Sequence, residues 1–185
     1  MTDTTLIQSL SAAQLQDILQ SLGYRVTRSE QNGMVQLLSA TQGVGFAVRF
    51  GNPGHADGEF VDYTLSCALR VQGELPQGLV EAWNLGKRFA RLAQQGVFLV
   101  LEMDVIAAGG VTGNHLRATT ELWDRVLQEF LLFLRQYAGQ GTQQGGAAAP
   151  TVASENDVAA APARTAPAVA AAADPTLAEA AGADR

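Results

Sequence analysis

Apolar residues near the amino terminus recur at the three- and four-residue spacing of an α-helix. The stripe consists of Leu15, Ile18, Leu19 and Leu22. Ser11 and Gln14 have the spacing of a capping box, and Gly23 follows at the point where a helix end favours a left-handed residue. The pattern predicts a helix over residues 12–22.

An alternating pattern then replaces the helical one. It predicts strands over residues 24–28, 34–39, 43–50 and 61–71. The last of these is the clearest, because every odd position from Val61 to Val71 is apolar and most even positions are polar. This period of two indicates an antiparallel sheet with one buried and one hydrated face. Asn32-Gly33 is a hairpin signal between the first two strands.

A second helix is predicted from Pro76, a residue favoured in the first helical turn, to Gln95. Trp83 and Phe89 are expected to face the core from this helix. Residues 97–106 alternate again and are predicted to form a further strand.

The last periodic segment begins after Thr112, a helix-capping residue, and runs to about Tyr137. A helix this apolar must lie across the sheet, and part of its apolar surface is expected to face a second chain. The residues predicted to form that interface are Trp123, Phe130, Leu131, Phe133 and Leu134.

The predicted order is helix, three or four strands, helix, strand and long helix. Strands that follow one another without intervening helices indicate hairpins, so the fold class is α+β, with an antiparallel sheet of about five strands packed by helices. Composition changes after Tyr137, because residues 138–185 lack Phe, Tyr, Trp, Ile and Met. We therefore predict a folded domain over residues 5–137 and a disordered Ala/Pro/Gly-rich tail over residues 138–185.

The net charge of −6 argues against nucleic acid as a partner. Lys87, Arg88 and Arg91 are read as a solvated helix face rather than a phosphate site. No segment has the apolar length of a membrane span, and no signal peptide is visible. The single cysteine, Cys67, fits a reducing compartment, so a cytoplasmic protein is expected.

Candidate chemistry is sparse. Glu102 and Asp104 share one face of a predicted strand, which is compatible with acid/base work, but a hydrated sheet face is the favoured interpretation. Cys67 is predicted to be a buried, inert thiol. His55 and His115 have no Cys, Asp or Glu at metal-ligand spacing. We predict no catalytic residue, no metal and no cofactor, and hence not an enzyme.

One series of motifs resembles the YbjN family, which is described as bacterial sensory transduction regulators. It comprises Trp83-Asn84 followed by Arg88-Phe89, then an apolar strand with acidic residues, then Gly109-Gly110-Val111-Thr112 before the long helix. The resemblance is best over residues 75–135. The family-motif residues, with structural or interaction roles, are Trp83, Asn84, Arg88, Phe89, Gly109, Gly110 and Thr112. Asn84 and Arg88 are four apart, so they are predicted to share a helix face, where they could hydrogen-bond each other. A contact that positions the helix is favoured over a binding role.

The family is similar in fold to type III secretion chaperones, which implies a sheet packed by helices, dimerisation and protein binding. The function predicted from the sequence is therefore a non-catalytic protein-interaction module, chaperone-like or regulatory, that acts as a homodimer. The alternative is a small-ligand sensor domain in bacterial signalling.

Overall fold

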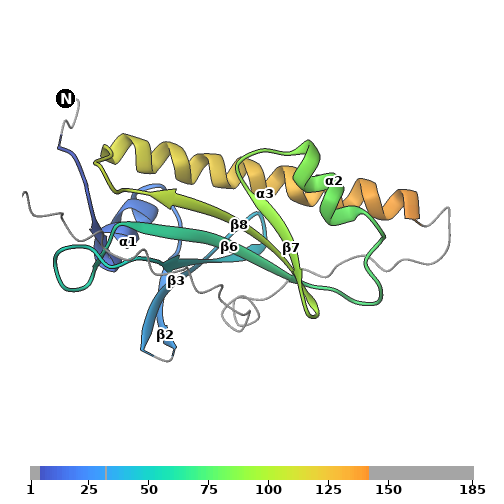
Figure 1. Ribbon diagram of the computed structural model, residues 1–185, viewed down its shortest axis with the longest axis horizontal. Helices are drawn as coiled ribbons and strands as arrows, with labels where there is room; N and C mark the ends of the chain where they lie inside the picture. Colours follow the sequence, from blue (N-terminus) through green and yellow to red (C-terminus); the bar gives the residue numbers. More distant parts are fainter. Residues whose placement is uncertain (1–4, 32, 142–185) are drawn as a thin grey trace, which may run out of the picture.

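The computed structural model describes residues 5–31 and 33–141, which form three helices and two antiparallel sheets (Figure 1). The elements in chain order are β1 (Leu10–Ser11), α1 (Ala12–Ser21), β2 (Thr27–Gln31), β3 (Met34–Thr41), β4 (Val44–Phe50), β5 (Glu59–Phe60), β6 (Asp62–Arg70), α2 (Leu79–Gly86), β7 (Arg91–Gln95), β8 (Phe98–Ile106) and α3 (Gly113–Gly141). The α+β class predicted from the sequence is confirmed.

The main sheet has six antiparallel strands in the order β2-β3-β4-β6-β8-β7. Its centre is the long β6–β8 pair, which runs from Asp62 opposite Ile106 to Arg70 opposite Phe98. The small second sheet pairs β1 with β5. The strand that the sequence did not predict in the main sheet is β7.

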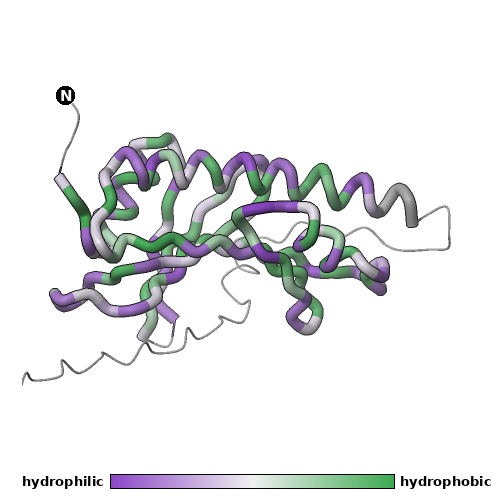
Figure 2. The backbone as a smooth tube through the Cα atoms, turned by 45° about the horizontal axis from the view of Figure 1, so that its top comes forward, coloured by the Kyte–Doolittle hydropathy of each residue, from purple (hydrophilic) through white to green (hydrophobic). Residues whose placement is uncertain are grey.

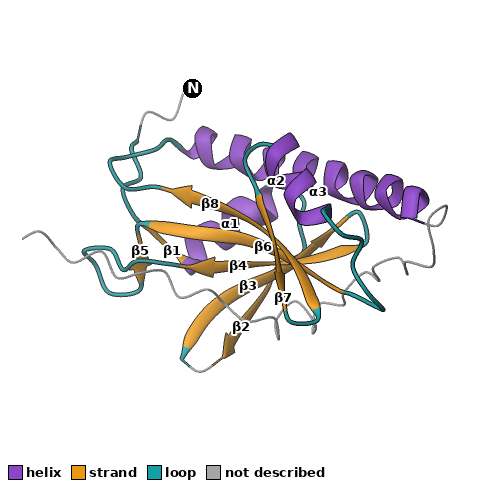
Figure 3. Ribbon diagram, turned by 45° about the vertical axis from the view of Figure 1, so that its right-hand side comes forward, coloured by secondary structure: helices purple, strands orange, loops and turns teal. Residues whose placement is uncertain are grey.

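The helices gather on one side of the main sheet (Figure 3). Trp123, Leu127 and Phe130 of α3 have no exposed surface and belong to the same buried cluster as the apolar faces of β4, β6 and β8. The tube in Figure 2 alternates between hydrophobic and hydrophilic along α3, as expected for a helix with one buried side.

The prediction for the first helix is confirmed in its details. The Ser11 amide donates to the Gln14 side chain over 2.8 Å, and the Gln14 amide donates to the Ser11 hydroxyl over 3.3 Å. At the other end Gly23 has φ +90°, and the amides of Gly23 and Tyr24 donate to the carbonyls of Gln20 and Leu19. This is the Schellman arrangement that a glycine after the last helical turn favours.

The prediction for the second helix is wrong in its second half. The helix ends at Gly86, the chain turns over residues 87–90, and residues 91–95 form β7 beside β8. Arg, Leu, Ala and Gln are good helix formers, so local propensity favours helix here. Backbone hydrogen bonds to a strand that comes later in the chain override that propensity.

The predicted interface on the last helix also needs correction. Trp123, Phe130 and Leu134 are at most 5% exposed and pack into the core of their own chain, so they present no surface to a second one. Leu131 and Phe133 are half-buried, and the Phe133 ring packs against Trp83 with the centroids 5.3 Å apart. The packing of α3 on the sheet therefore buries most of the apolar surface from which the sequence analysis predicted a dimer.

The final helix continues past Tyr137 to Gly141, so the predicted end of the helix is a few residues too early. The remainder of the predicted tail, residues 142–185, lies outside the described residues. Among the helices of the described part, none has both the length and the hydropathy needed to cross a membrane.

Candidate functional site

Two side chains of α2 hold the chain that follows the helix. The Trp83 indole N–H donates to the Ala90 carbonyl over 3.0 Å. The Asn84 side-chain amide donates to the Leu92 carbonyl and its oxygen accepts from the Leu92 amide, both over 2.8 Å. The predicted hydrogen bond between Asn84 and Arg88 is replaced by this pair of contacts, because the helix ends before Arg88.

The Asn84 side chain therefore makes the two hydrogen bonds with the Leu92 backbone that a neighbouring strand would make. β7 is the last strand at its end of the sheet, and a strand in that place presents unpaired backbone groups that can recruit another chain. The Asn84 side chain satisfies both backbone groups of Leu92. It also fixes how the loop between α2 and β7 leaves the helix.

Phe89, in that loop, has an unusual backbone. Its φ is +74°, and the other described non-glycine residue with positive φ is Gln42. Gln42 lies in the two-residue turn between β3 and β4, where the twist of a hairpin requires such a conformation. Phe89 lies in no hairpin, and for a bulky residue this conformation costs roughly 1–2 kcal/mol.

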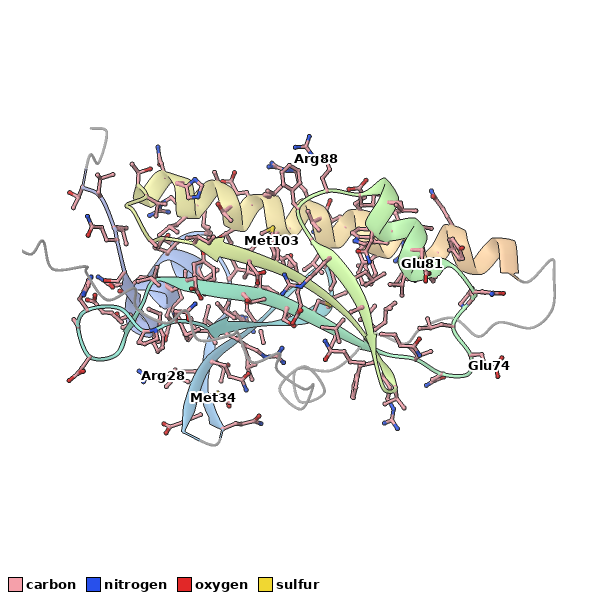
Figure 4. All side chains as sticks on the ribbon, in the orientation of Figure 1. Arg28, Met34, Glu74, Glu81, Arg88 and Met103 are labelled. Carbon is pink, nitrogen blue, oxygen red and sulfur yellow. The ribbon has the colours of Figure 1, made fainter. Side chains whose placement is uncertain are left out.

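The Phe89 side chain is also 60% exposed, which corrects the prediction that it faces the core. The Arg88 guanidinium carbon lies 5.0 Å from the centroid of the Phe89 ring, in cation–π contact. Figure 4 shows the Arg88 side chain projecting outward at the margin of the molecule. The structure thus holds an aromatic ring and a cation together at the surface.

Next to this loop, Arg91 bridges two carboxylates of β8. Its guanidinium lies 3.2 Å from a Glu102 carboxylate oxygen and is also bonded to the Asp104 carboxylate, which in turn accepts from the Thr64 hydroxyl over 2.7 Å. The hydrogen bond with Asp104 is the main cause that raises the pKa of Arg91, and burial opposes it. Both acids that the sequence singled out are thus held by one cation.

Glu102 is the buried member of this group, with 3% of its surface exposed. A second arginine lies close by on β4, where Arg49 donates to the Ser66 hydroxyl over 3.1 Å. Burial lowers the pKa of Arg49, and the charge of Glu102 opposes that shift. A buried carboxylate needs such cationic neighbours to stay ionised.

A shallow depression of about 430 Å³ joins these parts. Its lining residues are Asn84, Phe89, Ala90, Arg91, Glu102 and Asp104. It is open to solvent along its length. Its walls combine one aromatic ring with an ion-paired cluster, which suits a contact surface better than an enclosed reaction chamber.

A family model matches residues 11–136, and its description is "YbjN: Putative bacterial sensory transduction regulator". The chain belongs to the YbjN family. No curated protein and no solved structure matches the chain. The similarity of the YbjN domain to secretion chaperones therefore stays a prediction.

The Gly-Gly-Val-Thr motif of the YbjN domain has a structural role. Gly109 and Gly110 have φ +85° and +98°, and a Cβ on Gly110 would come within 3.4 Å of the Leu6 side chain. Val111 exchanges backbone hydrogen bonds of 2.7 and 2.9 Å with Ile7. The Thr112 hydroxyl accepts from the His115 amide over 3.2 Å and caps α3, as predicted.

The other sequence candidates are placed apart from the depression. Cys67 is fully buried, as predicted, and burial raises its pKa to about 12. His55 and His115 are exposed. Within the described residues no group of three or more His, Cys, Asp or Glu side chains could hold a metal ion.

Sequence reasoning identified the residues of the depression but not their arrangement. It treated Arg91 as part of a solvated helix face and Glu102 with Asp104 as a separate feature. Their connection requires β7 to pair with β8, which places Arg91 opposite Glu102. The segment Arg-Leu-Ala-Gln-Gln has no regular alternation of apolar and polar residues, so its sequence carries no strand signal.

Proposed function

We propose that the YbjN domain is a non-catalytic regulatory module that binds other protein chains through its α2 corner, which we define as Leu85, Arg88 and Phe89. The observation that carries the proposal is Phe89, whose ring is 60% exposed on a backbone with φ +74°. A residue that costs stability and buries little of its surface has no evident structural reason. Such outliers gather where a protein binds something.

The composition of the α2 corner supports a protein as the partner. Leu85 is 90% exposed, and it lies three residues before the Arg88–Phe89 cation–π pair. Aromatic residues and arginine dominate the binding free energy of protein interfaces. The hydrogen bonds from Trp83 and Asn84 fix the loop before a partner arrives, which lowers the entropic cost of binding.

A homodimer is part of the proposal. A two-fold axis near the α2 corner would bring two copies of Leu85 and Phe89 together and cover both. This replaces the interface first expected on the buried side of α3. A chaperone-like role would use the same surface for a partner protein in place of the second copy.

The pairing of Arg91 with Glu102 and Asp104 supports a non-catalytic role. Both carboxylates of the depression already have an arginine as their partner. A cytoplasmic location is also part of the proposal, and the free thiol of Cys67 supports it.

Phe89→Gly provides the test, because glycine adopts the loop conformation without strain while the ring is lost. Leu132→Ser is the matched control, since Leu132 is 54% exposed on α3 outside the α2 corner. Light scattering on the full chain should show a dimer for the wild type and the control, and a monomer for Phe89→Gly. Quantitative affinity purification should show partner proteins depleted from Phe89→Gly alone.

The two parts of the proposal fail separately. A monomeric wild type at micromolar concentration would refute the homodimer and leave the protein-binding surface standing. Equal partner recovery for wild type and Phe89→Gly would refute the surface.

The small-ligand sensor is the second candidate, and the depression is the observation in its favour. A polar metabolite would have to compete with the Arg91 ion pairs for its contacts. A thermal-shift screen should give a stabilising ligand whose effect is lost in Asp104→Asn. A screen without any such ligand would count against a sensor.

A further inference from the structure

The two edges of the main sheet differ in what covers them. At the β7 edge, the Asn84 side chain binds both backbone groups of Leu92. The other edge is β2, and no strand of the described residues pairs with its outer side. Four of the five residues of β2 are exposed, and its hairpin with β3 projects from the body of the sheet (Figure 1). A free edge of this kind can pair with the edge of another chain.

The register of the β2–β3 hairpin identifies the backbone groups on the outer side. Gln31 pairs with Met34 across a two-residue turn, so these two residues exchange backbone hydrogen bonds. Bonded and non-bonded pairs alternate along an antiparallel ladder, so Arg28 and Glu30 are at non-bonded positions towards β3. Their amide and carbonyl groups therefore point away from the sheet, where a further strand can bind them.

We propose that β2 pairs with β2 of a second copy of this chain, antiparallel, about a two-fold axis at Ser29. Each Arg28 then lies opposite a Glu30 of the other copy, and their outward backbone groups bond to one another. The side chains of such a pair lie on the same face of the joined sheet and are oppositely charged. The edge is thus complementary to itself.

Charge selects this register. Pairing through the outward backbone groups of both copies can be centred on Arg28, on Ser29 or on Glu30. A centre at Arg28 or at Glu30 places that charge opposite itself, which is destabilising. A centre at Ser29 joins opposite charges. Arg28 and Glu30 are both exposed, and neither takes part in the ion pairs of the described residues.

This contact is independent of the α2 corner, because β2 and β7 are opposite edges of the main sheet and α2 is bonded to β7. It uses five residues from each copy. A contact this small is typical of transient interfaces, so we expect a dissociation constant on the order of 1 mM. At the micromolar concentrations that test the α2 corner, the β2 edge is therefore unpaired. It joins copies that are already concentrated.

Sedimentation equilibrium of the full chain, from micromolar to millimolar concentration, tests the proposal. The mean mass of the wild type should rise in the millimolar range towards twice its micromolar value. Glu30→Arg and Arg28→Glu should each weaken this step by about tenfold or more, because attractive pairs become repulsive. An equimolar mixture of the two variants should restore it, since the arginines of one variant then face the glutamates of the other.

Glu74→Arg and Arg135→Glu are the matched controls, because they make the same charge changes at exposed positions outside β2. Each control should associate like the wild type. Controls that also lose the step would assign the effect to net charge and would overturn the proposal. So would a wild-type mass that stays constant up to millimolar concentration, or a mixture of Glu30→Arg and Arg28→Glu that fails to associate.

The result can be read whether or not the α2 corner forms a dimer. The step doubles the species present at micromolar concentration, which is a dimer if the α2 corner pairs and a monomer if it does not. A missing step above a micromolar dimer would refute the β2 contact alone. A doubling of a micromolar monomer would support the β2 contact and refute the homodimer at the α2 corner.

Discussion

At Phe89 the backbone conformation and the side-chain type are in conflict. The residue adopts the region that glycine favours, and its ring is mostly in solvent. Hydrogen bonds to the residues just after it impose the conformation, since Ala90 is bound by Trp83 and Leu92 by Asn84. The strain is therefore local, and it is held in place by the helix before it.

Phe89→Gly should be more stable than Phe89→Ala by about 1 kcal/mol, because glycine alone relieves the left-handed strain. Both variants lose the ring, so the comparison isolates the backbone. Denaturant unfolding of the two variants measures the difference. Equal stability would show that the loop relaxes and stores no strain.

Asn84→Ala should lower the free energy of unfolding by about 2 kcal/mol, because two hydrogen bonds to the Leu92 backbone are lost. Asn114, which is exposed near the start of α3, provides the control. Asn114→Ala should change stability by less than about 0.5 kcal/mol. Similar losses in both variants would remove the special role given to Asn84.

For single residues, the sequence predicted which side chains belong to the motif better than it predicted what those side chains contact. Trp83, Asn84, Arg88 and Phe89 stood out as a motif, and all four lie at or beside the loop. The partners of Trp83 and Asn84 are backbone groups at residues 90 and 92, which carry no side-chain signal in the sequence. Whether Phe89 points inward or outward depends on where α2 ends, and no proline marks that position.

Among the elements, α3 depends most on its first turn. Thr112 caps the helix, and the two glycines before it let the chain reverse beside the amino-terminal segment. The capping hydroxyl satisfies one of the amides that a helix start leaves without a partner. The cap therefore links the long helix to the loop that precedes it.

Thr112→Ala should cost about 1 kcal/mol of stability, and Thr112→Ser should recover most of it, because serine supplies the same hydroxyl. Thermal unfolding of the three chains gives the order. A serine variant as unstable as the alanine variant would assign the effect to the lost methyl group rather than to the cap.

The strands were predictable where alternation is long and the helices where caps are strong. α1 has both a capping box and a glycine stop, and its predicted bounds differ from the observed ones by one residue at the end. β7 has neither a long alternation nor a turn residue before it. Its structure is decided by pairing with β8, which follows the hairpin at Gly96.

For the whole molecule, the burial of titratable side chains makes the free energy of unfolding depend on pH in the alkaline range. Burial raises the pKa of Cys67 from 9.0 to about 12, and it also raises the pKa of Tyr63. The folded state favours the neutral thiol, so this contribution is complete below pH 9 and is lost as pH rises from 9 towards 12.

The free energy of unfolding should therefore fall above pH 9, by up to about 1.4 kcal/mol per pH unit for the thiol. Cys67→Ala should reduce that slope and leave the part due to Tyr63. Urea unfolding from pH 7 to pH 10.5 measures both chains. Parallel curves above pH 9 would show that the thiol is not the group responsible.

The contact between Ile7 and Val111 sets an order of events during synthesis. The two residues are 111 − 7 = 104 positions apart, and each bonds to the backbone of the other. A growing chain leaves the ribosome from its amino terminus, so Ile7 emerges long before its partner exists. The residues around Ile7 are therefore made long before they can reach their native place.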